Sequence, residues 1–136
     1  MTSRQRWILG LTFAGSLIAV GLQYWPIPYN RLSLPNAVWG TPLIAVAVFG
    51  VVARVTAGIG FWRTLLVFSG AVPAAVMARV VFEGILDPTS HNLWPFEIAL
   101  ASGPGLVAGS AAAIIGTLLA FLGLGAKGSE AGQDSD

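Results

Sequence analysis

Four long apolar stretches dominate the chain, and short segments rich in polar residues, glycine or proline separate them. They cover residues 7–23, 37–55, 61–82 and 96–124. An α-helix rises about 1.5 Å per residue, so about 20 apolar residues cross the roughly 30 Å hydrocarbon core of a bilayer. The pattern predicts an all-α integral membrane protein with four transmembrane helices. We expect an antiparallel up-down bundle that forms a single domain over residues 1–125.

Proline and glycine set the expected limits of these helices. Three prolines in residues 24–36 disfavour helix and predict a loop. The glycines of residues 56–60 predict a short turn between antiparallel neighbours. Pro73 predicts a kink, because neighbouring groups in a bilayer can satisfy the carbonyl that a proline frees. In the last run, residues 102–105 predict a kink or a shallow interfacial piece before the true span, and residues 126–136 predict a disordered cytoplasmic tail.

The amino-acid composition is also typical of a protein that a lipid bilayer surrounds. Only 10% of the residues are charged and the mean hydropathy is +0.77, whereas soluble domains carry about a quarter charged residues. A net charge of +1 argues against nucleic-acid binding, and the absence of cysteine excludes disulfides and thiolate chemistry. All five tryptophans lie at the ends of apolar runs, where their rings suit the membrane interface: Trp7, Trp25, Trp39, Trp62 and Trp94.

Lysine and arginine near the helix ends predict the orientation in the cell membrane. Cytoplasmic ends are enriched in these residues. One side of the expected bundle carries Arg4, Arg6, Arg54, Arg63 and Lys127, and the other carries Arg31 and Arg79. The bias predicts a multi-pass protein with both termini in the cytoplasm.

Arg79 is the one charge well inside an apolar run, and Glu83 lies one helical turn further on the same face. We expect Arg79 to extend outward and pair with Glu83 near the headgroups. The alternative is a functional anion site or gating ion pair. Glu97 lies at the start of the last helix, where a carboxylate interacts favourably with the helix dipole. The alternative role for Glu97 is a protonatable group that faces a cavity.

Glu83, Asp87 and His91 are spaced by four residues, and carboxylates with imidazole are plausible zinc or manganese ligands. Gly84 and Pro88 interrupt this spacing, so a turn capped by the Asp87 side chain is the favoured interpretation. We therefore predict no metal and no cofactor.

Small residues form a stripe along the last apolar run, and Gly105 and Gly109 make a GxxxG match that Gly116 extends. Such stripes let helix backbones approach closely. The partner helix could lie in this chain, in a second copy or in another membrane subunit.

The polar residues give little support to catalysis. The chain has one histidine and none of the common hydrolase, metalloprotease or phosphate-binding motifs. We expect a non-enzymatic structural or accessory subunit of a membrane assembly, of bacterial type, whose surroundings are the lipid bilayer. The alternative is a small transporter or channel with an outward-facing polar vestibule around Arg79, Glu83 and Glu97.

Overall fold

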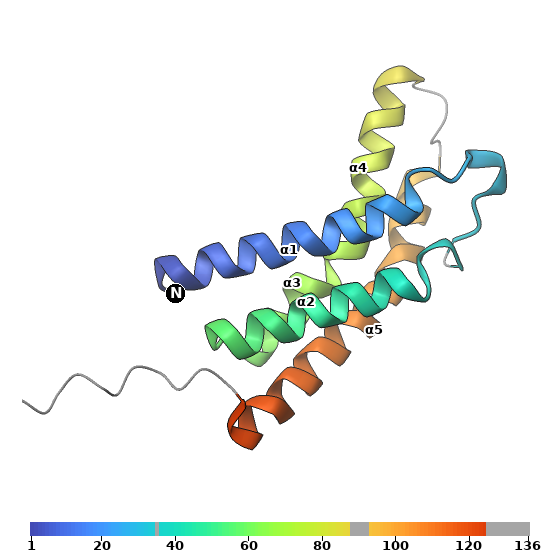
Figure 1. Ribbon diagram of the computed structural model, residues 1–136. Coiled ribbons are helices and arrows are strands. Elements are labelled where there is room, and N and C mark those ends of the chain that lie inside the picture. Colours follow the sequence, from blue (N-terminus) through green and yellow to red (C-terminus); the bar gives the residue numbers. More distant parts are fainter. Residues whose placement is uncertain (35, 88–92, 125–136) are drawn as a thin grey trace, which may run out of the picture.

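The computed structural model describes residues 1–34, 36–87 and 93–124, and every regular element in these ranges is a helix (Figure 1). The five α-helices are α1 (Ser3–Tyr24), α2 (Thr41–Ala57), α3 (Phe61–Ser69), α4 (Ala71–Leu86) and α5 (Trp94–Leu119). Three shorter helices complete the fold: the 3₁₀ helices η1 (Tyr29–Arg31) and η2 (Asn36–Val38) and the π-helix η3 (Ala120–Leu124). The predicted all-helical fold is confirmed.

Three helical stretches in the described residues are long and apolar enough to cross a bilayer, rather than the four predicted. They are Ser3–Tyr24, Phe61–Leu86, which joins α3 and α4, and Trp94–Leu124. The fourth apolar helix, Thr41–Ala57, is shorter, at 17 residues. It corresponds to the predicted run 37–55 but begins later.

α1 begins four residues before the apolar run that predicted it, because capping decides where a helix starts. The Thr2 hydroxyl accepts a hydrogen bond from the Gln5 backbone N–H at 3.2 Å, and the Gln5 side chain accepts one from the Thr2 N–H at 2.9 Å. This capping box satisfies two N–H groups that lack helical partners. Gln5 also donates to the Ala57 carbonyl at 2.9 Å, which ties the start of α1 to the end of α2.

α2 begins at Thr41 because the residues before it cannot continue an α-helix. Gly40 has φ +90°, a backbone conformation that glycine adopts readily, and Pro42 occupies the first turn, where a missing N–H costs little. The helix ends at Gly58, with φ +62°. Arg54 donates to the Ile59 carbonyl and so holds the turn into α3.

The third predicted run is two helices that meet at Gly70, and α4 continues to Leu86. Pro73 has no N–H, so the Ser69 carbonyl four residues earlier loses its helical donor. The break therefore lies where Pro73 predicted a kink. Gly84 does not end the helix as expected, because one interior glycine costs only about 1 kcal/mol.

α5 runs without interruption through Pro104, so the break expected at residues 102–105 does not end it. A separate interfacial piece is absent from this helix, which is continuous from Trp94 to Leu119. The chain then continues into η3, a short π-helix in which Gly123 has φ +77°.

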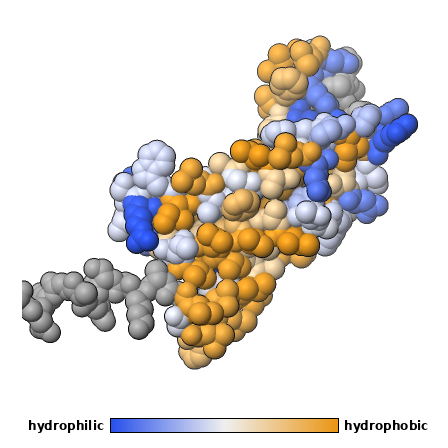
Figure 2. Space-filling model, viewed as in Figure 1, coloured by the Kyte–Doolittle hydropathy of each residue, from blue (hydrophilic) through white to orange (hydrophobic). Residues whose placement is uncertain are grey.

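Figure 1 shows α1 and α2 side by side, with α5 crossing the bundle beside α2 and α3. The end of α4 beyond Arg79 rises away from the other helices. Figure 2 shows a broad apolar surface over the helices, between polar regions at the two ends of the long axis of the bundle. This distribution is the one expected when hydrocarbon surrounds the middle of the protein.

Candidate functional site

Arg79 lies on α4 and faces inward onto the end of α1, with only 6% of its surface exposed. Its Nε donates to Glu83 Oε1 at 2.7 Å, and its two terminal nitrogens donate to the carbonyls of Tyr24 at 3.0 Å and Ile27 at 2.7 Å. The guanidinium carbon also lies 5.0 Å from the centre of the Tyr24 ring. The ion pair with Glu83 forms, and the expected position of Arg79 near the headgroups stays a prediction.

The position of Arg79 follows from the chemistry of a helix end. The last carbonyls of a helix have no helical donors, and they form the negative end of its dipole. Tyr24 closes α1, and Ile27 follows it in the loop. The buried guanidinium donates to both carbonyls, of which that of Tyr24 also accepts from the Ile27 N–H at 3.3 Å, and Glu83 balances its charge. Arg79 therefore caps α1 from a neighbouring helix.

Trp25 makes a second bond between the same two elements. Its indole Nε1 donates to the Ala75 carbonyl of α4 at 3.1 Å, one turn before Arg79. The ring lies back along α1 over Gly21, where an added Cβ would come within 2.5 Å of it. Glycine at this position thus allows Trp25 to reach α4.

A hollow of about 420 Å³ opens beside the ion pair and is lined by Trp25, Ala78, Arg79, Phe82 and Glu83. The Glu83 side chain is 29% exposed, so the carboxylate borders the hollow while it accepts from Arg79. The walls are mainly apolar and aromatic. Such a hollow can hold a small ligand whose polar group meets the carboxylate.

The remaining residues of the predicted polar cluster are placed separately or not described. Glu97 lies in the first turn of α5, as predicted, and is not among the residues that line the hollow. Asp87 follows the last turn of α4 as its C-cap and is exposed. His91 lies outside the described residues, and within the described ranges no three His, Asp or Glu side chains are grouped as metal ligands. The structure thus brings together Arg79 and Glu83.

Sequence reasoning missed the residues of α1 and its loop that complete the site. Tyr24 and Ile27 contribute backbone carbonyls, which every residue has and which leave no signature in a sequence. Trp25 carried a partial signal, because a tryptophan at the end of an apolar run has an N–H that needs a partner. That signal identifies a donor but not the acceptor at Ala75.

The small-residue stripe of α5 packs inside the chain. An added Cβ at Gly105 would lie 2.3 Å from the Ser69 carbonyl oxygen, and one at Gly109 would lie 2.2 Å from the Ser69 hydroxyl oxygen. At Gly116 the nearest group is the Arg54 side chain, at 2.8 Å. Helices α3 and α2 therefore cover the face that the sequence offered to a partner helix.

No protein-family model matches the chain, and neither a curated protein nor a solved structure matches it. The proposals that follow therefore rest on the residues and contacts described above.

Proposed function

We propose that the protein is a multi-pass protein of the cell membrane, with both termini in the cytoplasm, that serves as a non-enzymatic structural or accessory subunit of a membrane assembly. One observation carries the proposal. Arg79, the charge deepest in an apolar helix, is bound to Glu83 and to two carbonyls at the end of α1. These bonds engage its charge within the fold, which supports a structural role for Arg79 over a substrate-binding one.

Hydroxyl groups support the membrane placement. In the described helices, serine and threonine side chains donate to the carbonyl four residues earlier, as at Thr12, Ser16, Thr56, Thr64, Ser102 and Thr117. This bonding hides a polar group within its own helix. It suits a hydrocarbon environment, where an unsatisfied polar group costs several kcal/mol.

The end of α4 beyond Arg79 is the surface that we propose for contact with a partner subunit. It leaves the bundle (Figure 1), and its large apolar side chains Val81, Phe82, Ile85 and Leu86 are exposed. The stripe on α5, in contrast, is already packed against α2 and α3. A helix that extends from its own bundle can pack between the helices of a neighbouring membrane protein.

Photo-crosslinking in native membranes tests this proposal. A photoreactive amino acid replaces Ile85, which is 77% exposed on α4, or in the control Ile18, which is 51% exposed on α1. We expect a discrete protein adduct from position 85 and only lipid adducts from position 18. The same partner should comigrate with the wild-type protein on native gels in mild detergent. A monomer on those gels, with lipid adducts from both positions, would contradict the proposal.

The hollow beside Glu83 favours a second candidate, a small transporter, because its carboxylate borders a space of about 420 Å³. Liposome flux separates the two functions. A transporter should lose flux in Glu83→Gln, which removes the charge and keeps the shape, while Asp87→Asn at the exposed end of α4 should retain it. No flux above protein-free liposomes for the wild type would exclude this candidate.

A further inference from the structure

Within the described residues, one end of the bundle collects arginines from three elements and carries no acidic side chain. The described acidic residues Glu83, Asp87 and Glu97 belong to the end of α4 and the start of α5, away from Arg4, Arg6, Arg54 and Arg63. These four arginines belong to the start of α1, the end of α2 and the start of α3. The bond from Gln5 to the Ala57 carbonyl, at 2.9 Å, holds the first two elements together, and α3 begins four residues after Ala57.

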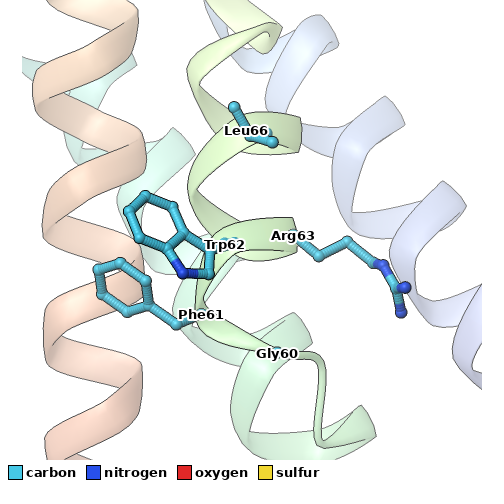
Figure 3. Close-up of a pocket in the computed structure, with 5 residues that line it drawn as sticks. All are labelled: Gly60, Phe61, Trp62, Arg63 and Leu66. Atoms are coloured by element: carbon cyan, nitrogen blue, oxygen red, sulfur yellow. The ribbon is translucent and has the colours of Figure 1, made fainter.

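A depression of about 420 Å³ lies at this end, lined by Gly60, Phe61, Trp62, Arg63 and Leu66 (Figure 3). The Phe61 and Trp62 rings meet edge to face, with their centres 5.4 Å apart. Figure 3 shows both rings on one side of α3 and Arg63 extending from the other side. Trp62 is 72% exposed, and Leu66, one turn further along the helix, is exposed as well.

From this arrangement we propose that the first turn of α3 binds an anionic phospholipid of the cytoplasmic leaflet. Arg63 meets the phosphate of the headgroup, Trp62 lies at the level of the ester groups, and the acyl chain runs along Leu66. The proposal rests on the membrane placement proposed above.

Three features favour an anionic lipid over other ligands. Arginine presents several N–H donors that match phosphate oxygens, and tryptophan prefers the headgroup level of a bilayer. An exposed leucine one turn from the cation provides the apolar continuation that a free phosphate would not use. Arg54, nearby, donates to the Ile59 carbonyl and holds the turn, so Arg63 is the exposed cation of the depression itself, with the exposed Arg4 and Arg6 on α1 at the same end of the bundle.

Fluorescence quenching by brominated lipids tests the site. The variant retains Trp62 and carries phenylalanine at the other four tryptophans, and it is placed in phosphatidylcholine vesicles with a small fraction of either brominated phosphatidylcholine or brominated phosphatidylglycerol. We expect an association constant about fivefold higher for the anionic lipid, the size typical of one cation near a membrane surface. Arg63→Gln should bring the ratio close to one. Arg31→Gln, at the opposite end, should leave it unchanged.

The outcomes separate this inference from the membrane placement. Equal quenching by both lipids overturns the anionic site and leaves the membrane placement standing. Quenching by neither lipid contradicts the membrane placement itself. Loss of the preference on adding soluble glycerol phosphate would show that the free anion is sufficient, and would overturn the assignment to a lipid.

The wild-type chain provides a second measurement if the variant with one tryptophan does not fold. Native mass spectrometry from mild detergent counts the phosphatidylglycerol molecules that remain bound. That number should fall in Arg63→Gln and stay constant in Arg31→Gln. Equal retention by all three chains would overturn the site.

Discussion

Alanine substitutions along α5 should lower stability at glycines that pack closely against another helix and not at Gly103, which does not. At Gly105 an added Cβ would lie 2.3 Å from the Ser69 carbonyl oxygen. That oxygen belongs to the backbone at the junction of α3 and α4, so it cannot rotate away as a side chain would. At Gly103, two residues earlier on the same helix, an added Cβ would meet nothing within 4 Å. Gly103→Ala is thus a matched control for Gly105→Ala.

The expected loss follows from the separation that the new methyl group requires. An ordinary contact begins near 3.4 Å, so α5 and α3 would have to move apart by about 1 Å. A gap of this size forfeits up to about half of the dispersion energy of each contact across the interface. Overpacking of this kind typically costs about 1–3 kcal/mol. Alanine also gains up to about 1 kcal/mol of helix propensity over glycine, and the Gly103→Ala control measures that gain.

Reversible unfolding in mixed micelles, followed by the helical circular dichroism signal, measures the free energy of unfolding of each variant. We expect Gly105→Ala to be less stable than Gly103→Ala by about 1–3 kcal/mol. Gly116→Ala should fall between them, because its neighbour at 2.8 Å is the flexible Arg54 side chain. Equal stability of Gly105→Ala and Gly103→Ala would refute the close approach of α5 to α3.

Three further predictions use the same unfolding assay or hydrogen exchange. Arg79→Met removes the bonds to two carbonyls and the charge that pairs with Glu83, and it should cost about 3–5 kcal/mol. Arg63→Met on the exposed surface should change stability little, and similar losses for both would contradict the capping role. Trp25→Phe removes the bond to the Ala75 carbonyl and should cost about 1 kcal/mol. Gln5→Ala removes the side-chain half of the capping box, which is the bond from the Thr2 N–H, and the bond to α2. Amide exchange in the first turn of α1 should therefore accelerate while that of α5 stays constant.

The helix interiors could be predicted from the apolar pattern, and the helix ends could not. Hydropathy reports what surrounds a side chain, whereas a helix end depends on which backbone groups find partners. Thr2 and Gln5 lie in a polar segment, so the apolar run gave no reason to place the start of α1 at Ser3. Ala37 and Val38 are apolar, yet Gly40 separates them from α2. At the other end of the chain, Pro104 is accommodated within α5.

Of the contacts in the candidate site, only the one between residues close in the sequence could be predicted. Arg79 and Glu83 are four residues apart on one helix, and the sequence alone shows that they share a face. The two carbonyls that Arg79 caps are 55 and 52 residues away along the chain, at Tyr24 and Ile27. Their position depends on how α1 packs against α4. No pattern of side chains records that packing.

Arginine side chains meet two irregularities of the backbone, and a closely packed helix covers a third. Arg79 covers the end of α1, Arg54 covers the turn after α2, and Gly105 lets α5 lie directly against the carbonyl that Pro73 frees. In hydrocarbon no water can perform these tasks, so the side chains of the protein must. The same requirement explains why so few polar groups in the described helices are left to bind a substrate. Experiments on function are therefore best directed at the outer surfaces, which are the end of α4 beyond Arg79 and the basic end of the bundle.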